Sequence, residues 1–291
     1  MAFKKDGVLL EKTYLKDSDI IDNFVGNTLF STGYNANGQL GDGSSTNKST
    51  PVQTTAGGTN WRSICVSSVN SHMAVIKTNG ELWLWGLNDY GQLGRGSGIA
   101  PSSSPMQTAL TGTNWRQVSC GSDHTVAIKT TGELWIWGAN GSYQLGNNST
   151  AHKSTPVQTI AGGTNWKQAA CGTSFTAAIK TNGELWTWGL NSQGQLGNNS
   201  IATASTPVQV LPGSTNWKQV ACGYELTTAI KTDGTLWTWG YKLNGQLGDN
   251  TRDLKSTPVQ TILAGNNWKQ VGVTGSMTYG SVSAITFSDL Q

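Results

Sequence analysis

The stretch Glu184-Leu185-Trp186-Thr187-Trp188-Gly189 decides the fold, because close copies of it recur along the chain. The copies occupy 81–86, 133–138 and 235–240, and their tryptophan pairs follow one another at intervals of 52, 51 and 51 residues. Self-similarity at a fixed period of about fifty residues is the signature of a repeat architecture. We therefore interpret every other motif by its position within the repeat.

Two shorter elements repeat in step with the tryptophan pair and bring the number of repeats to five. An Asn-Trp-Lys/Arg element starts at Asn60, Asn114, Asn165, Asn216 and Asn267. A Gln-Leu-Gly element ends at Gly41, Gly94, Gly146, Gly197 and Gly248. The Asn-Trp elements and the tryptophan pairs together contain all 13 tryptophans of the chain. Rings that recur in one register are expected in the core, not at a ligand.

Each repeat contains four candidate β-strands. In one copy they are 207–210, 216–222, 227–231 and 235–239, and Asp233-Gly234 between the last two is a two-residue hairpin turn. Four antiparallel strands per repeat describe a propeller blade. We predict an all-β protein: a single β-propeller of five four-stranded blades, with the propeller domain at 27–291.

The same residues carry a family resemblance. The run 188–197, followed by Pro207, Cys222-Gly223 and 229–231, resembles the regulator-of-chromosome-condensation repeat, and the resemblance covers roughly residues 27–288. It implies a β-propeller, although members of that family usually have seven blades and this chain has five repeats. The founding members promote guanine-nucleotide exchange on a small GTPase, and no insertion for that task is recognisable in this sequence.

The two ends of the repeat array indicate how the ring would close. Residues 27–33 align with the fourth strand of a repeat, and 282–287 align with a third strand that has no fourth strand after it. We expect these segments to pair and to close one composite blade, which would remove two exposed sheet edges. An open arc completed by a second subunit is the alternative.

The cysteines occupy defined positions in the repeat. Cys120, Cys171 and Cys222 each lie five residues after an Asn-Trp tryptophan, where the outer repeats have valine. Cys65 lies one position earlier in its own repeat and should face the opposite way. Ligand-type Cys-x-x-Cys spacing is absent, so we expect buried free thiols and no metal site. Disulfides are not expected, because equivalent positions of successive blades diverge from the axis.

No constellation of residues for catalysis is recognisable. His72 and His124 precede the third strand, where Phe175 and Leu226 stand in other repeats, so they are expected to be packing positions. No nucleophile is placed beside a histidine and an acid, and the Gln-Leu-Gly element lacks the Lys-Ser/Thr of a phosphate loop. We predict a protein that is not an enzyme and that takes no cofactor or metal.

Composition and charge exclude two classes of partner. The net charge is only +3 and the basic residues are scattered singly, so no basic stripe for nucleic acid is present. No stretch approaches the roughly twenty apolar residues that span a bilayer. No secretory signal is recognisable. Glu81, Glu133 and Glu184 each follow a turn glycine and are expected to be exposed turn residues, not paired carboxylates.

Loops that differ between repeats mark a candidate binding surface. The second-to-third and fourth-to-first connections share one face of the disc and vary in sequence, whereas those of the opposite face are nearly identical copies. Variable loops on a uniform scaffold commonly carry recognition, and Tyr and Arg commonly anchor protein interfaces. Drift of unconstrained loops is the alternative. The candidate binding residues are Tyr90, Arg95, Asp123, Tyr143, Tyr224, Glu225, Tyr241 and Arg252.

Residues 1–26 belong to no repeat and form a candidate docking segment, with a strap packed on the propeller as the alternative. Asp17-Ser18-Asp19 is typical of a helix start. This lead-in gives a second, weaker resemblance, to virion-associated propeller proteins of tailed bacteriophages. The apolar residues expected to dock are Leu15, Ile20, Ile21 and Phe24.

These observations predict a non-enzymatic structural and binding propeller. We expect a phage virion component, such as a fibre, tail or capsid-surface protein, that presents variable loops for protein or host-surface recognition. It would be made in the cytoplasm and located in the virion, with the cytoplasm as the alternative. Its partners would be other virion or assembly subunits, and a cell-surface glycan is possible as a further partner. A multivalent glycan-binding lectin and an intracellular protein-interaction module or GTPase regulator are the alternative functions.

Overall fold

The computed structural model describes residues 28–67, 72–96, 98, 100–241, 245–263, 265–273 and 281–286, and the backbone of two short strands near the N-terminus. Those strands, β1 (Lys4–Lys5) and β2 (Val8–Leu9), pair with each other. The described residues form strands, turns and loops and contain no helix, which confirms the all-β prediction. Among them, accordingly, no helix is long and apolar enough to cross a membrane.

Four antiparallel sheets of four strands make up most of the molecule. The first contains β5 (Trp61–Val66), β6 (His72–Lys77), β7 (Leu82–Gly86) and β8 (Ser102–Gln107). The second contains β9 (Trp115–Cys120), β10 (His124–Lys129), β11 (Leu134–Gly138) and β12 (Lys153–Gln158). The third contains β13 (Trp166–Cys171), β14 (Phe175–Lys180), β15 (Leu185–Gly189) and β16 (Ala204–Gln209). The fourth contains β17 (Trp217–Cys222), β18 (Leu226–Lys231), β19 (Leu236–Gly240) and β20 (Lys255–Gln260).

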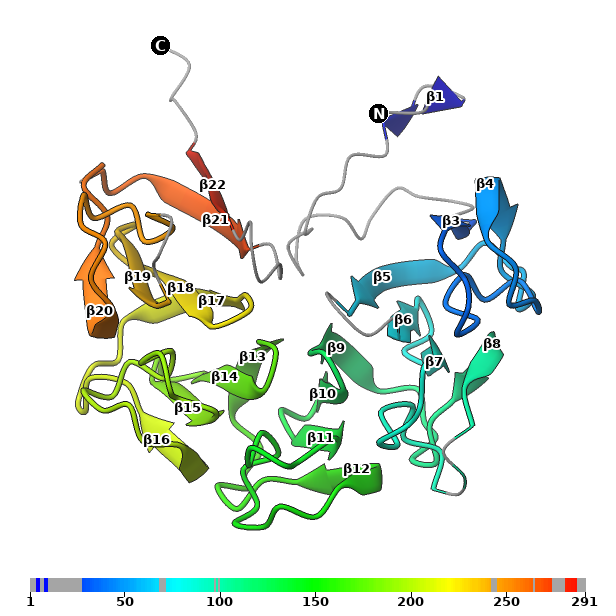
Figure 1. Cartoon of the computed structure of the whole chain (residues 1–291), viewed down its shortest axis with the longest axis horizontal. Coiled ribbons are helices and arrows are strands. Elements are labelled where there is room, and N and C mark those ends of the chain that lie inside the picture. Colours follow the sequence, from blue (N-terminus) through cyan, green and yellow to red (C-terminus); the bar gives the residue numbers. More distant parts are fainter. Residues whose placement is uncertain are drawn as a thin grey trace.

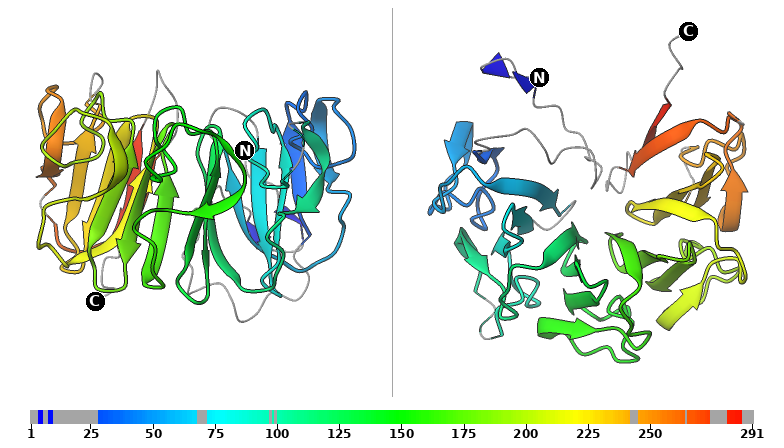
Figure 2. Two further views of the ribbon diagram at one scale, coloured as in Figure 1. Left: turned by 90° about the horizontal axis from the view of Figure 1, so that it is seen from below. Right: turned by 180° about the vertical axis from the view of Figure 1, so that it is seen from behind.

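The sheets stand side by side around an arc, with the first strand of each sheet toward the centre and the fourth at the rim (Figure 1). Seen edge-on, the strands run between the two faces of a disc (Figure 2, left). This is the radial arrangement of a β-propeller. Connections between strands therefore lie on one face of the disc or on the other.

The sheets are offset by one strand from the sequence repeats. We interpreted the Pro-Val-Gln segment as the first strand of its own repeat, but β16, which contains Pro207, pairs with β15, with Val208 opposite Thr187. Each complete sheet begins with the Asn-Trp strand and ends with the strand that holds the Pro-Val-Gln segment or, in β8, its counterpart. A period is the same wherever counting starts, so the repeat alone could not show which strand begins a sheet.

The apolar core lies between neighbouring sheets. One cluster brings Val126, Ile128 and Ile136 of the second sheet together with Trp166 and Trp188 of the third. Trp188 is fully buried, and its ring meets that of Trp166 edge to face with the centroids 6.3 Å apart. The prediction that the recurring tryptophans are core residues is confirmed for the fully buried ones. These are Trp85, Trp115, Trp137, Trp166, Trp188, Trp217 and Trp239.

Buried hydrogen bonds set the spacing between sheets. Trp188 Nε1 donates to the Gln144 carbonyl at 2.8 Å, and Thr176 Oγ1 donates to the same oxygen at 2.9 Å. Both donors belong to the third sheet, whereas Gln144 lies in the loop that joins β11 to β12. The two lone pairs of the carbonyl are thus both used by the neighbouring sheet. The same pair of bonds recurs at the next interface, on the Gln195 carbonyl.

Two half-sheets lie at the ends of the arc, β3 (Phe30–Gly33) with β4 (Lys48–Gln53) and β21 (Trp268–Val273) with β22 (Val282–Thr286). They face each other across an opening in the arc (Figure 1; Figure 2, right). Together they contain the four strands of one sheet, but in the described part of the chain β3 and β22 are not paired. Closure of a five-bladed ring by these strands stays a prediction.

Candidate binding surface

The connections of each sheet divide between two faces of the disc. Leu190 N donates to the Ser174 carbonyl at 2.9 Å, and Tyr241 N donates to the Glu225 carbonyl at 2.8 Å, so first-to-second and third-to-fourth connections lie together. We call their shared surface the variable-loop face; its described loop residues in the complete sheets are 67, 87–96, 98, 100–101, 121–123, 139–152, 172–174, 190–203, 223–225, 241 and 245–254. The hairpin turns and the links between sheets form the opposite face. There Trp217 N donates to the Gly183 carbonyl at 3.0 Å.

A buried asparagine organises the long loops of the first three complete sheets and the loop between β3 and β4, whereas the fourth sheet has Lys242 at the equivalent position. Asn191 has no exposed surface; its Nδ2 donates to the carbonyls of Ser200 and Ala202, both at 2.9 Å, and its Oδ1 accepts from Leu196 N at 2.9 Å. One amide side chain therefore ties both ends of the loop together. Equivalent side chains are Asn35, Asn88 and Asn140.

The sequence analysis missed these asparagines, although a signal for them exists. Each lies five residues before the leucine of a Gln-Leu-Gly element, a spacing that recurs with the repeat. The glycine of that element is required as well. Gly197 has φ +66°, and a Cβ there would lie 2.5 Å from Trp239 Nε1. Only glycine allows this loop to pass so close to the neighbouring sheet.

All eight candidate binding residues lie on the variable-loop face, although no observation tests their role in binding. Three of them come together at the fourth sheet, where Tyr224 and Glu225 precede β18 and Tyr241 follows β19. Burial raises the pKa of Glu225 above its ordinary value. Burial, and after it the nearby Glu225 and Tyr241, raises the pKa of Tyr224. We call these three residues the tyrosine–glutamate patch.

The other five candidates are distributed along the arc. Tyr90 and Arg95 lie on the long loop of the first sheet, where Arg95 Nη2 donates to the Ala100 carbonyl at 3.1 Å. The Tyr90 ring meets His152 of the next long loop edge to face, with centroids 4.9 Å apart. Asp123 and Tyr143 lie on two loops of the second sheet, and Arg252 lies on the loop that begins with Tyr241. The structure therefore offers several separate contact points on this face.

The two buried histidines are packing residues that join sheets. His124 has no exposed surface, and its Nε2 lies 3.0 Å from Thr176 Oγ1 on the next sheet. His72 makes the same contact with Thr125 at 3.0 Å. Burial lowers the pKa of His124 to about 3 and that of His72 to about 4. Both rings are therefore neutral at physiological pH, in agreement with the predicted packing role.

The opposite face carries a repeated lysine–tryptophan cluster that the sequence analysis did not predict. Lys180 Nζ lies over the rings of Trp166 and Trp186, 5.2 and 4.5 Å from their centroids, and 3.8 Å from a Glu184 oxygen. Trp186 Nε1 donates to the same carboxylate at 3.1 Å. The glutamates of these turns are half-buried and form ion pairs with lysine, so our expectation of exposed turn residues was wrong. We had not expected the indole N–H of Trp186, two residues after Glu184, to reach the glutamate carboxylate.

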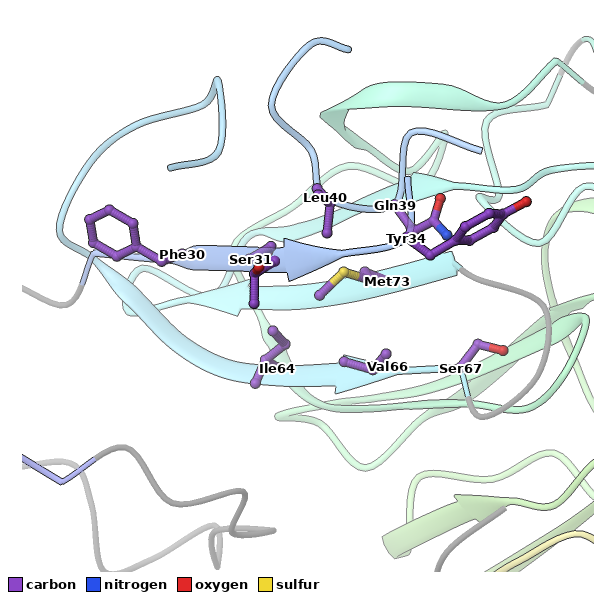
Figure 3. Close-up of a pocket in the computed structure, with 10 residues that line it drawn as sticks. Phe30, Ser31, Tyr34, Gln39, Leu40, Ile64, Val66, Ser67 and Met73 are labelled. Atoms are coloured by element: carbon purple, nitrogen blue, oxygen red, sulfur yellow. The ribbon is translucent and has the colours of Figure 1, made fainter. Parts of the chain in front are cut away.

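An apolar groove lies beside the opening of the arc. Phe30 and Ser31 of β3, Ile64 and Val66 of β5 and Met73 of β6 line it (Figure 3). Ile64 is 51 % exposed and Val66 is 54 % exposed. The equivalent residues of β21, Val271 and Val273, are buried by the sheet that precedes them. The groove was not predicted, because it depends on which sheet covers β5.

Three further predictions concern the docking residues, a metal site and the cysteines. The docking residues Leu15, Ile20, Ile21 and Phe24 lie outside the described residues. Within the described ranges, no group of three or more His, Cys, Asp or Glu side chains is placed to hold a metal ion. The four cysteines are free, as expected.

A family model decides what kind of propeller this is. The model described as the RCC1-like domain matches residues 23–284, nearly the whole chain. This chain belongs to the RCC1-like domain family. The resemblance seen in the repeats is thereby confirmed, and the family relation holds for a chain with five repeats.

Several curated proteins contain a similar RCC1-like domain. The ultraviolet-B receptor UVR8 of Arabidopsis thaliana is 31% identical over 226 residues, which cover 77% of this chain and 51% of the receptor. The human E3 ubiquitin-protein ligase HERC2 is 30% identical over 218 residues, which cover 72% of this chain and 4% of the ligase. This chain therefore spans about half the length of the receptor and a small part of the ligase.

Solved structures share the fold of this RCC1-like domain. Human WBSCR16 superposes with a TM-score of 0.72 at 23% identity, covering 84% of this chain and 64% of that chain. Prp20p from Saccharomyces cerevisiae superposes with a TM-score of 0.70 at 19% identity, covering 83% of this chain and 60% of that chain. At these identities the likeness shows a common fold only.

Proposed function

We propose that this RCC1-like domain is a non-enzymatic protein-interaction module whose variable-loop face binds a protein partner. The observation that carries the proposal is the uniform frame beneath divergent loops. Buried asparagine side chains hold the long loops of the first three complete sheets in one geometry, while the exposed residues on those loops differ from sheet to sheet. A rigid frame with variable side chains lowers the entropic cost of binding and leaves specificity to the loops.

The tyrosine–glutamate patch is the proposed anchor. Tyr224, Glu225 and Tyr241 are partly buried and lie together, so a partner can cover their aromatic surface at one place. Tyrosine adds a hydroxyl that can bond across an interface. Glu225 would favour a basic group on the partner, because such a group offsets the cost of burying its carboxylate.

Related proteins favour an interaction module or a GTPase regulator over a virion component. One crystal structure shows yeast RCC1 (Prp20) bound to Kap60. Another is described together with the binding of Prp20p to Gsp1p and histones. These are properties of those proteins, and they support protein partners here by analogy. The virion role, a glycan ligand and either location are not supported by these relatives and stay predictions.

Paired variants on the two faces test the proposal. Tyr224→Ala with Tyr241→Ala alters the variable-loop face, and Thr164→Ala with Thr181→Ala alters exposed residues of the opposite face. Partners would be identified by crosslinking to the wild-type protein and mass spectrometry, and their affinities for purified variants measured by calorimetry. We expect the first pair to weaken binding at least about tenfold and the second pair to leave it unchanged. Equal affinities for both pairs would contradict the proposed surface.

A GTPase regulator is the second candidate, and a separate measurement addresses it. A small GTPase from the source organism is loaded with a fluorescent guanine nucleotide, and the release rate is measured with and without the protein. If the protein accelerates nucleotide release and the Tyr224→Ala/Tyr241→Ala variant does not, the interaction module is a GTPase regulator. Binding without acceleration would leave it an interaction module.

A further inference from the structure

Two cysteines on neighbouring sheets face each other across an interface. Cys65 lies on β5 and Cys120 on β9, and both thiols are free. The Cys120 backbone N–H donates to Cys65 Sγ at 2.9 Å. The Cys120 thiol donates to the Cys65 carbonyl oxygen at 3.7 Å. These reciprocal contacts hold the two residues side by side.

Strand alternation explains why these two thiols meet. Side chains at the position of Cys65 face the following sheet, and those at the position of Cys120 face the preceding sheet, so the two positions share an interface. Our expectation that disulfides are absent considered only equivalent positions, such as Cys120 and Cys171. Non-equivalent positions of successive sheets were not compared, and these are the ones that come together.

The next interface repeats the geometry with serine. Cys171 N donates to Ser119 Oγ at 3.0 Å, and the Cys171 thiol donates to the Ser119 carbonyl at 3.4 Å. Ser119 there occupies the position of Cys65. In the following interface Ala170 occupies that position and Cys222 has no thiol or hydroxyl opposite it at this site. Among the interfaces between described sheets, two thiols meet only between β5 and β9.

Distance and chemistry are compatible with a bond between the sulfurs. From the contact between Cys65 Sγ and Cys120 N, standard bond lengths place the two α-carbons within about 7 Å of each other. Disulfides form when this distance is at most about 7 Å. Hydrogen bonding by Cys120, whose backbone N–H donates to Cys65 Sγ, lowers the pKa of Cys65, whereas burial raises the pKa of Cys120. Cys65 is also the less deeply buried residue of the two, and its lowered pKa makes it the better nucleophile.

We propose that Cys65 and Cys120 are a redox site, at which a reversible disulfide links the β5–β8 sheet to the β9–β12 sheet. The oxidant is a low-molecular-weight disulfide such as oxidised glutathione. Cys65 loses its proton to water, and its thiolate attacks one sulfur of the oxidant and releases one glutathione thiolate. Cys120 then gives its proton to that thiolate and attacks the Cys65 sulfur, which releases the second glutathione as a thiolate that takes up a proton from water. The protein loses two thiol hydrogens and the oxidant is reduced to two thiols.

Peptide mass spectrometry tests the proposal directly. The folded wild-type protein is incubated with oxidised glutathione, free thiols are blocked, and the chain is cut with trypsin. The four cysteines fall on four different peptides, 63–77, 117–129, 168–180 and 219–231. We expect a 63–77 to 117–129 linkage that dithiothreitol reverses, and a melting temperature roughly 5–10 °C higher in the oxidised form.

Two variants are matched controls: one removes the pair of thiols and the other creates a second pair. Cys65→Ser copies the serine interface and should leave no linked peptide. Ser119→Cys copies the cysteine interface and should add a second linkage, to Cys171, so that four thiols are lost in place of two. No linkage in the wild type, a lasting glutathione adduct on Cys65, or equal linkage to Cys171 and Cys222 would each overturn the proposal. So would an S119C variant that loses only two thiols.

Discussion

His124 Nε2 lies 3.0 Å from Thr176 Oγ1, and this contact is one of those that join the second sheet of the propeller to the third. The threonine hydroxyl has one hydrogen, which it donates to the Gln144 carbonyl at 2.9 Å. It can therefore only accept from the histidine, so the imidazole carries its proton on Nε2. Nδ1 of the same ring is buried, and no described atom donates to it.

Acid should destabilise the protein through its two buried histidines. Their folded pKa values, about 4 for His72 and about 3 for His124, lie below the ordinary value of 6.5. The unfolded chain therefore binds protons first as the pH falls, and stability is lost from pH 6.5 down to the folded pKa values. At pH 5 we expect a loss of about 2 kcal/mol for each ring. Urea unfolding at pH 7.5 and pH 5 measures it.

Residues from other repeats supply the control for this prediction. Phe175 and Leu226 occupy the same position in the third and fourth sheets. The double variant His72→Leu/His124→Leu should lose most of the stability difference between pH 7.5 and pH 5. An unchanged difference would show that other groups titrate in this range.

Replacing Gly197 with alanine should loosen the joint between the third and fourth sheets. Its φ of +66° disfavours a side chain, and the new Cβ would displace Trp239 Nε1 from the Gln195 carbonyl. We expect a loss of roughly 2–5 kcal/mol in the free energy of unfolding. The control is Gly213→Ala, where φ is +86° but no atom lies within 4 Å of the new Cβ. That variant should lose only about 1–2 kcal/mol, from backbone strain.

Replacing Asn191 with alanine should free the loop at 190–203. The change leaves the carbonyls of Ser200 and Ala202 and the N–H of Leu196 without their present partner. Hydrogen exchange should become faster in this loop while the strands of the other sheets keep their rates. Asn182→Ala is the control, because Asn182 is exposed and accepts a single hydrogen bond from Glu184 N. Equal exchange in both variants would contradict the organising role of Asn191.

The half-sheets at the opening should pair in a register that the complete sheets define. β18 and β19 place Thr228 opposite Thr238, and the same register places Ser283 of β22 opposite Ser31 of β3. Ile285 is 47 % exposed, whereas its counterpart Ile230 is fully buried. Pairing would cover such residues and remove two free edges.

Engineered cysteines test this register. In a background without the native cysteines, Ser31→Cys/Ser283→Cys should form an intramolecular crosslink in the monomer. Ser31→Cys/Thr286→Cys is out of register and should crosslink far less. A crosslinked dimer would mean that a second copy completes the arc. The absence of any crosslink would mean that the arc stays open.

The sequence by itself determined the number of repeats, the all-β class and the family. It did so because residues such as Trp188, Gly197 and Cys171 recur at one period, and a period can be recognised without knowledge of any contact. The alternation of side chains along a strand also predicted that Cys65 faces the opposite way to Cys120, Cys171 and Cys222. The buried histidines were predicted correctly, since Phe175 and Leu226 at the same position indicate a packing site.

Only the tertiary structure decided which elements meet between repeats. The pairing of Val208 with Thr187, the contact of Cys65 with Cys120 and the exposure of Ile64 all depend on where one sheet lies against the next. A repeat gives every copy the same local environment in sequence. The copies differ in the structure because the first and the last lack a neighbouring sheet on one side. They also differ because a single change of residue, such as Cys65 at the position of Ser119, acts through the residue opposite it on the adjacent sheet.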